Sequence, residues 1–253
     1  MNALRAIPIF LLSLCCFFTV YHPKAEGFSP TLRDQASQWQ TRLQKDILPY
    51  WLETTRDVQY GGFLASDAMD GSRRATEKQL VSQSRLIWGF SLAHRKGYGD
   101  KDHDYLAAAQ NGYRFLQEHF LDKKNGGYFW TTEIDGTLKQ DMKVLYGQVF
   151  VVYALVELYR ADNDLEVLDQ ALRLYRNLQE HAHDDEHGGW FEHFEADWTP
   201  ILDPDAAIIV EKSGHKSANT HLHLMEAYTE LYAVTGDSKV KKSLMEEIGR
   251  AHV

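Results

Sequence analysis

Apolar residues recur every three or four positions along most of the chain beyond residue 30, and this spacing is typical of amphipathic helices. The pattern predicts helical segments at 31–55, 77–97, 102–121, 141–162, 164–182, 216–236 and 237–251. Gly97 stands at the end of the second segment, where it is a typical stop signal. The sequence therefore predicts a fold made mainly of helices.

The predicted helices alternate between two kinds of apolar pattern. Residues 144–159, VLYGQVFVVYALVELY, are apolar on nearly all sides, which indicates a helix buried on both faces. Residues 164–181 carry one apolar stripe and one charged face, which indicates an outer helix. Pairs of inner and outer helices are typical of an all-α fold of the α/α toroid, or α/α barrel, class.

Three short stretches of one pattern interrupt these helices: DVQYGGF, DKKNGGY and DDEHGGW, which begin at Asp57, Asp122 and Asp184. The intervals are 122 − 57 = 65 and 184 − 122 = 62 residues, and such a period indicates a repeat architecture. Each glycine pair precedes a short alternating run, which predicts a short β-hairpin. Because only about three and a half units are present, we expect an incomplete ring of helical hairpins.

The first 25 residues form a separate segment. Arg5 precedes an apolar run from Ile7 to Tyr21 that is too short for a comfortable membrane span, and Ala25 is a possible cleavage point. This pattern predicts a signal peptide at 1–25, export to the periplasm or medium, and a mature domain at 27–253 without a stable membrane span. A lipid anchor on Cys15 and a retained amphiphilic anchor are the alternatives.

Composition narrows the classes of partner. The net charge is −9 and no basic stripe occurs, so we expect no nucleic-acid partner. Both cysteines, Cys15 and Cys16, lie in the predicted leader, so the mature chain has neither a disulfide nor a catalytic thiol.

The stretch NTHLHLMEA carries two histidines on a predicted helix. His221 and His223 are two residues apart and therefore point about 200° apart, so they cannot serve one metal site. Asn219 and His223 are four residues apart and share one face. Either both histidines pack in the core or an interface, or Asn219 and His223 line a cavity.

Arg85 and Tyr146 are further candidates, since each lies on an apolar helix face. Arg85 forms either a structural salt bridge or a cationic donor in a cavity, and Tyr146 is either a core aromatic or a ligand-binding phenol. The cluster HAHDDEH at 181–187 contains potential metal ligands. Because Asp184 belongs to the repeated turn and the sister turns lack such a cluster, a solvated loop is the favoured interpretation, and we expect no metal site.

Three stretches, Lys78–His94, Lys143–Ala161 and Lys216–Asp237, together with the glycine-pair motifs, resemble cellobiose 2-epimerases of the N-acylglucosamine 2-epimerase superfamily. The resemblance covers nearly all of residues 30–250 and implies an (α/α)6 barrel. It also implies inversion of carbon 2 of a reducing-end sugar through an enediolate, with a monosaccharide or oligosaccharide substrate. No metal, nucleotide or other cofactor is implied in the chemical step.

The same resemblance implies roles for four residues. Arg85 matches an active-site arginine, Tyr146 a cavity tyrosine, and Asn219 an asparagine of the site. His223 matches a catalytic histidine, and imidazole suits proton transfer because it titrates near neutral pH. Arg85 and Tyr146 would stabilise the enediolate oxygens.

The chain departs from the family pattern in one respect. The family's principal acid/base histidines lie in a Gly-His-x-x-Glu segment and near the C-terminus, and this sequence has no match to either. We therefore expect the N-terminal part of an epimerase domain with little or no activity of its own. An aldose–ketose isomerase on the same barrel and a non-catalytic sugar-binding module are the alternatives.

Overall fold

The computed structural model describes residues 30–65, 76–203 and 214–250. The predicted signal peptide at 1–25 lies outside these residues. The chain divides into two compact units, one up to Gln40 and the other from Thr41 onward, and α1 (Pro30–Arg42) belongs almost entirely to the first. Within the described ranges, no helix is both long enough and apolar enough to cross a membrane.

Helices make up most of the second unit, as the sequence predicts. They are η1 (Leu43–Ile47), α2 (Leu48–Thr55), α3 (Leu80–Arg95), α4 (Tyr105–Phe115), η2 (Leu116–Phe120), α5 (Leu145–Asp162), α6 (Leu165–His181), α7 (Ala218–Thr235) and α8 (Ser238–Arg250). The two η segments are π-helical and continue directly into, or from, an α-helix. Each helical segment predicted in this unit contains at least one of these helices.

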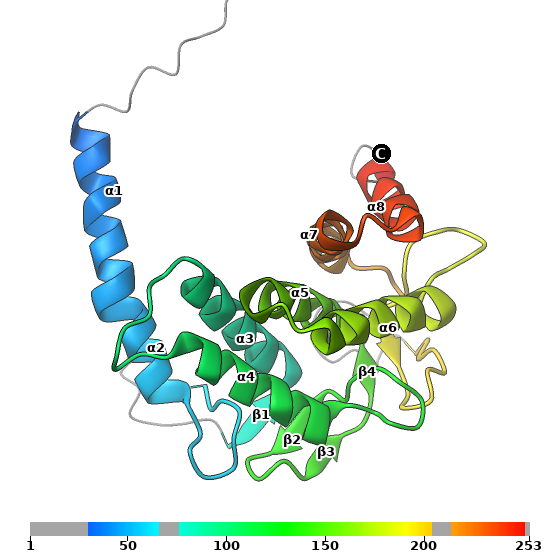
Figure 1. The fold of residues 1–253 in the computed structure, drawn as a ribbon. Coiled ribbons are helices and arrows are strands. Elements are labelled where there is room, and N and C mark those ends of the chain that lie inside the picture. The colour runs from blue at the N-terminus through cyan, green and yellow to red at the C-terminus, as the bar shows by residue number, and fades with distance from the viewer. Residues whose placement is uncertain (1–29, 66–75, 204–213, 251–253) are drawn as a thin grey trace, which may run out of the picture. The chain divides into compact units, whose positions relative to one another are not determined.

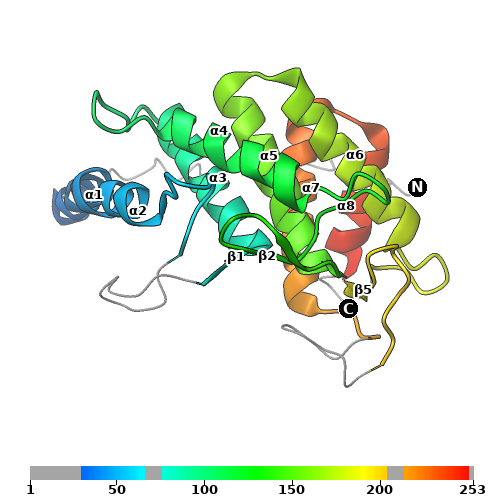
Figure 2. The ribbon, with the colours of Figure 1, turned by 90° about the horizontal axis from the view of Figure 1, so that it is seen from below.

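The helices pack in pairs. α3 packs against α4, α5 against α6, and α7 against α8, while α5 also contacts α3 on one side and α7 on the other (Figure 1). Seen from below, α5 lies between α3 and α7 (Figure 2). An inner row of α3, α5 and α7 with an outer row of α4, α6 and α8 is the packing of an α/α toroid, so the predicted fold class is confirmed.

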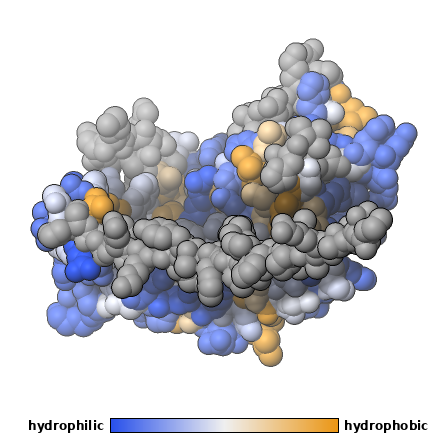
Figure 3. All heavy atoms as spheres, turned by 90° about the horizontal axis from the view of Figure 1, so that it is seen from above, coloured by the Kyte–Doolittle hydropathy of each residue, from blue (hydrophilic) through white to orange (hydrophobic). Residues whose placement is uncertain are grey.

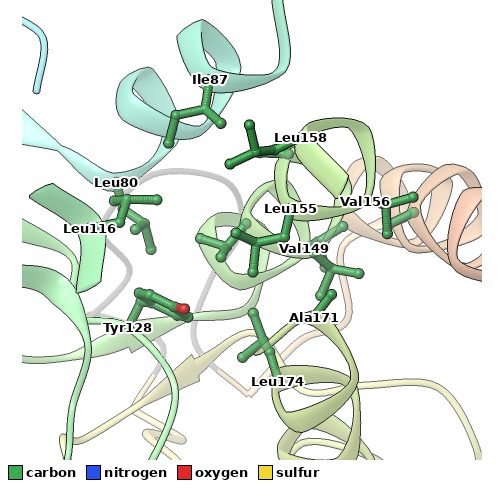
Figure 4. Packing of buried hydrophobic residues seen from close by; sticks show 14 of the residues in the cluster. Leu80, Ile87, Leu116, Tyr128, Val149, Leu155, Val156, Leu158, Ala171 and Leu174 are labelled. Atoms are coloured by element: carbon green, nitrogen blue, oxygen red, sulfur yellow. The ribbon is translucent and has the colours of Figure 1, made fainter. Parts of the chain in front are cut away.

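The core is centred on α5, which is buried on nearly all sides as predicted. Figure 4 shows Val149, Leu155 and Leu158 of this helix among apolar side chains of α3, η2 and α6. In α6, one stripe faces the core, and the rest of the helix is at least partly exposed. The contrast follows from the hydrophobic pattern, since a helix with one apolar stripe can bury only one side.

The strands are short and precede or follow the helices. β1 (Glu77–Gln79), β2 (Thr131–Glu133) and β3 (Leu138–Gln140) form one antiparallel sheet, and β4 (Lys143–Val144) pairs with β5 (His193–Phe194). The prediction that residues 77–79 and 143–144 are helical is therefore wrong. These residues are extended because their backbones pair with strands that follow the next glycine pair.

The three glycine pairs form tight turns, and each turn is closed by a single bridge between flanking residues. Both glycines of each pair have positive φ, for example +75° at Gly126 and +74° at Gly127. A Cβ at Gly127 would lie 2.5 Å from Cζ2 of Trp198, so only glycine fits this backbone and this space. The predicted β-hairpins are thus reduced to turns at these sites, and β2 and β3, which follow the second turn, form a hairpin ladder further on.

A lysine holds each turn against the start of an inner helix. Nζ of Lys78 lies 2.8 Å from Oδ2 of Asp57, and Nζ of Lys143 lies 2.7 Å from Oδ2 of Asp122. Both side-chain pairs are buried, and burial lowers the pKa of each lysine. Lys216 makes the same contact with Asp184 at 2.5 Å in a more exposed setting.

A second polar contact recurs five residues after each lysine. The side-chain amide of Gln83 bonds both backbone groups of Phe63, at 2.8 and 2.6 Å, and Gln148 does the same to Tyr128. In the third unit, Nε2 of His221 accepts a hydrogen bond from the backbone N–H of Trp190 at 3.1 Å. The lysine and this residue together fix the position of each inner helix relative to its turn.

Large apolar side chains are also found on the surface of the second unit. Figure 3 shows apolar residues in separate places on a mostly hydrophilic face. Among the residues with more than half of their surface exposed are Val58, Leu165, Leu202, Leu222 and Met245. Single exposed apolar residues are normal in globular proteins.

Candidate active site

The residue seven positions after each repeat lysine faces the same region of the inner row. These residues are Arg85, Phe150 and His223, and seven residues correspond to about two helical turns. Cζ of Arg85 lies 4.3 Å from the centroid of the Phe150 ring. The rings of Phe150 and His223 are 4.7 Å apart between centroids. Three consecutive inner helices thus place equivalent residues in one contact chain.

Tyr146 joins the same group from the preceding turn of α5. Its hydroxyl accepts a hydrogen bond from Nη2 of Arg85 at 3.3 Å. Its ring meets the His223 ring edge-on, with centroids 5.4 Å apart. Arg85, Tyr146, Phe150 and His223 are hereafter called the Arg85 site, and three of its four members were predicted from the sequence.

Backbone contacts fix the start of α5 beside this site. The backbone N–H of Tyr146 donates to Oε1 of Glu192 at 3.1 Å, and that of Leu145 donates to the Glu192 carbonyl at 2.8 Å. Glu192 is buried, so one acidic residue receives two of the N–H groups that a helix N-terminus leaves without a helical partner. The backbone at the start of α5, from which Tyr146 projects, is therefore held by the residue that precedes β5.

His223 is oriented by an acidic residue of its own helix. Its Nδ1 atom lies 2.7 Å from Oε2 of Glu226, and about a quarter of its side chain is exposed. An ionised carboxylate only accepts hydrogen bonds, so this contact assigns the proton to Nδ1 in the neutral imidazole. Nε2 then carries a lone pair that can accept a proton from a bound molecule.

His221 points away from the site, as the helical spacing predicts. Its Nδ1 atom lies 2.7 Å from the carbonyl oxygen of Ser217, and its Nε2 atom accepts from Trp190. Both ring nitrogens are thus used to hold the turn and the helix together. For His221 the packing interpretation applies, whereas His223 contacts the rings of Tyr146 and Phe150 and keeps about a quarter of its side chain exposed.

Asn219 is exposed and, within the described ranges, forms no hydrogen bond with Arg85 or Tyr146. It lies three residues after Lys216, the position that Tyr146 holds after Lys143. The structure therefore places Asn219 at the equivalent helical position, without a hydrogen bond to Arg85 or Tyr146.

A groove of about 390 Å³ opens beside Arg85. Its lining comes from α2, α3 and the segment after the first glycine pair, and includes Leu48, Trp51, Ala65, Ser82, Arg85, Leu86, Gly89 and Phe90. A Cβ at Gly89 would meet nothing within 4 Å, so this part of α3 is open. The groove is mostly apolar, with Arg85 as its charged group.

The acidic and histidine-rich stretch at 181–187 does not gather as a metal site. His183 lies 2.8 Å from Asp185 through Nδ1 and 3.1 Å from Glu246 through Nε2, and Asp184 is paired with Lys216. In the part of the chain that the structure describes, no group of three or more His, Cys, Asp or Glu side chains is placed to hold a metal ion.

Phe150 and Glu226 were not among the site residues predicted from the sequence. Aligning the three units on Lys78, Lys143 and Lys216 would have found Phe150, because it holds the position of Arg85 and His223. Glu226 holds the position of Trp88 and Tyr153, whose rings stack 5.4 Å apart one turn beyond the Arg85 site. The repeated turns by themselves do not place the helices of the three units in register.

Residues 61–252 match the sequence profile of the N-acylglucosamine 2-epimerase (GlcNAc 2-epimerase) family. The chain belongs to this family. It is 35% identical over 210 residues to a cellobiose 2-epimerase of Dictyoglomus turgidum and 32% identical over 215 residues to one of Bacteroides fragilis. These alignments cover 81% and 84% of the chain but 51% and 53% of the relatives.

Solved structures agree with this family membership. The cellobiose 2-epimerase of Spirochaeta thermophila superimposes with a TM-score of 0.77 at 35% identity, over 88% of this chain and 54% of the other. The chain thus spans about half the length of the family members that it matches. Family membership makes the chain part of a carbohydrate isomerase family.

Proposed function

We propose that the chain carries the enediolate-stabilising half of a sugar 2-epimerase of the cellobiose or mannobiose type. The observation that carries this proposal is the contact of Arg85, Tyr146 and His223 in one site. A guanidinium, a phenol and an imidazole with a lone pair on Nε2 are the groups that proton removal next to a carbonyl requires. The similarity to cellobiose 2-epimerases supports the sugar class.

The reaction would begin with the open-chain form of the reducing-end sugar. His223 would accept the carbon-2 proton at Nε2, and the electron pair of that bond would form a carbon–carbon double bond with carbon 1. The carbonyl oxygen would take up the negative charge and give the enediolate. A proton from water on the opposite face of carbon 2 gives the epimer, and His223 releases its own proton to water, so no atom is gained or lost overall.

Arg85 is positioned to stabilise the developing charge. Its guanidinium lies over Phe150 and donates to Tyr146, so a substrate oxygen would meet a donor that is already oriented. A preoriented donor lowers the barrier because no reorganisation is needed during the reaction. Tyr146 can donate its own hydroxyl proton to a second oxygen while it accepts from Arg85.

Epimerisation needs proton transfer on both faces of carbon 2, whereas isomerisation to a ketose can use one base on one face. Among the described histidines, His223 is the one in ring contact with Tyr146 and Phe150. This observation favours aldose–ketose isomerisation as the second candidate function. For this chain we expect slow exchange of the carbon-2 proton and little net epimerisation.

Proton NMR of mannobiose and cellobiose in D2O tests the proposal. We expect loss of the carbon-2 proton signal with the full chain, and a reduction of about 10²–10⁴-fold in the His223→Ala variant. The His221→Gln variant is the matched control, because His221 lies outside the Arg85 site. Formation of a ketose would identify the isomerase. Sugar binding without exchange would identify a non-catalytic module and overturn the proposal.

We also propose export through residues 1–25. Support comes from the short positive start at Arg5 and the apolar run from Ile7 to Tyr21. N-terminal sequencing of the protein recovered from the periplasm or medium of expressing bacteria tests this. A mature N-terminus near Gly27 is expected, and an intact Met1 in the cytoplasm would contradict it.

A further inference from the structure

Two charged positions recur toward the C-terminal ends of the inner helices. Fourteen residues after the repeat lysine, α5 carries Glu157 and α7 carries Glu230. Seventeen residues after it, α3 carries Arg95 and α5 carries Arg160. These four charges lie at least two helical turns beyond the Arg85 site, which is about 10 Å along the helix axis.

Each of these arginines pairs with the glutamate of the next unit. Nε of Arg95 donates to Oε1 of Glu157 at 2.7 Å, from α3 to α5. Nη1 of Arg160 donates to Oε2 of Glu230, from α5 to α7. Within α5, Nη1 of Arg160 also lies 3.5 Å from Oε2 of Glu157. One chain of alternating charges therefore joins the three inner helices, and we call these four residues the ion ladder.

Burial makes the ion ladder sensitive to the alignment of the helices. Glu157 is only 3% exposed, so its carboxylate depends on the two arginines rather than on water, and a buried charge that loses a partner is strongly destabilising. Apolar packing between helices is non-directional and adapts more easily to small displacements. If α3 slid by one turn, about 5.4 Å, Nε of Arg95 would be drawn away from Glu157. Fixing register is the best-attested role of polar groups within helical interfaces.

The Arg85 site requires the same alignment. The contact of Arg85 with Phe150 joins α3 to α5, and the contact of Phe150 with His223 joins α5 to α7. These are the two helix pairs that the ion ladder connects further along their axes. A change of register in either pair would therefore separate residues of the site.

We propose that the ion ladder sets the axial register of α3, α5 and α7, and that Arg95 and Glu157 are thereby positioning residues for the Arg85 site. Their effect reaches the site through the helices themselves. A displacement of about 1 Å caused by a distant substitution can slow an enzyme by about 10²-fold. The register does not depend on the proposed sugar chemistry, whereas the expected effect on carbon-2 proton exchange rests on the proposed function.

NMR measures the register at the site without any sugar. Ring currents move the resonance of a proton above an aromatic face upfield, and the guanidinium of Arg85 lies over the Phe150 ring. The Nε–H resonance of Arg85, assigned by its absence in Arg85→Lys, is followed in the full chain labelled with nitrogen-15 arginine. Phe150→Leu gives its position without the ring current. Arg95→Met should move this resonance most of the way toward that position.

Further variants separate register from stability. Glu157→Gln should also move the Arg85 resonance, because an amide cannot neutralise two arginines, whereas Arg95→Lys keeps the charge and should retain most of the upfield shift. Arg173→Met is the matched control, since Arg173 pairs with Asp169 within α6 and this ion pair joins no two helices. Arg95 is partly exposed, so Arg95→Met decides the question if Glu157→Gln does not fold. Loss of unfolding free energy in Arg95→Met with an unchanged Arg85 resonance would overturn the inference.

Carbon-2 proton exchange tests the consequence for the site. At saturating sugar, Arg95→Met should slow exchange by at least about tenfold through displacement of the site. Phe150→Leu already removes the contact through which the ion ladder acts, so adding Arg95→Met to it should cause little further loss, although distant substitutions normally act independently. Independent losses in the double variant would contradict a positioning role. If the unaltered chain exchanges no carbon-2 proton, the proposed function fails, and the Arg85 resonance still decides the register.

Discussion

The Nδ1 atom of His223 and the Oε2 atom of Glu226 are 2.7 Å apart, one helical turn from each other on α7. This contact leaves the lone pair of the neutral ring on Nε2 of His223, and the ring itself contacts the rings of Phe150 and Tyr146. In the proposed reaction, the base His223 would therefore depend on a carboxylate that does not itself belong to the Arg85 site. Glu226 is a positioning residue in this arrangement.

The first prediction concerns Glu226→Gln. An amide can either accept from or donate to Nδ1, so the imidazole loses its fixed tautomer, and we expect carbon-2 proton exchange to slow by about tenfold. The exchange rate at saturating sugar should fall while the sugar dissociation constant is unchanged, as measured by NMR. Glu186→Gln is the control, because Glu186 lies beside His187 in a turn. If carbon-2 proton exchange slowed equally in Glu226→Gln and Glu186→Gln, Glu226 would have no specific role in positioning His223.

The second prediction concerns His221. Because His221 holds the position of Gln83 and Gln148, His221→Gln should keep an acceptor for the Trp190 N–H and change the free energy of unfolding little. His221→Ala should cost about 1–3 kcal/mol, since it leaves that partly buried N–H without its acceptor. Urea unfolding measures both. If the two variants are equally destabilised, His221 acts through packing rather than through the hydrogen bond.

The third prediction concerns the buried pair of Lys143 and Asp122. Lys143→Met should cost about 3–5 kcal/mol of unfolding free energy, because it leaves a buried carboxylate without its cation. Adding Asp122→Asn should restore part of this loss, which a double-mutant cycle measures. Lys216→Met should cost less, because the Lys216–Asp184 pair is more exposed. If the losses of unfolding free energy from Lys143→Met and Asp122→Asn simply add in the double variant, the two residues are not coupled.

The fourth prediction concerns pH and His193. Burial lowers the pKa of His193 below its ordinary value of 6.5, so the unfolded chain binds this proton more readily than the folded chain. The free energy of unfolding should therefore fall as pH drops below about 6.5, by up to about 1.4 kcal/mol per pH unit until the lower folded pKa is reached.

His193→Gln removes this titration while it keeps a polar side chain of similar size. Comparing urea midpoints at about pH 7.5 and 5.5 should show a smaller loss in the variant than in the unaltered protein. The difference between the two proteins is the measurement, since other groups titrate in the same range. The same pH dependence in both would show that His193 is not the cause.

The sequence was sufficient to predict the helices and their inner and outer rows. These depend on local periodicity and on an apolar stripe that must be buried. The start of α5 was placed too early because Lys143 and Val144 look helical in composition, and their extended conformation is set by pairing with β5, about fifty residues further on.

The position of Asn219 shows a second feature that helical spacing in the sequence does not predict. Asn219 and His223 share a face, as four residues on a helix must. Nevertheless, His223 packs against Phe150, while Asn219 is exposed at the first turn of α7. The face of a helix on which a residue lies can be inferred from sequence. Its position along the helix axis relative to a neighbouring helix depends on packing between segments that are far apart in the chain.

The contacts made by each repeat lysine and by the residue five positions after it have a consequence for how such a protein can diversify. They hold the turn and the helix from one side, and the residue seven positions after the lysine projects from the other. Arginine, phenylalanine and histidine occupy that position in the three units with the same surrounding backbone. Duplication of a unit would copy the supporting contacts unchanged. The residue seven positions after the lysine could then be substituted without loss of the contacts that stabilise the unit.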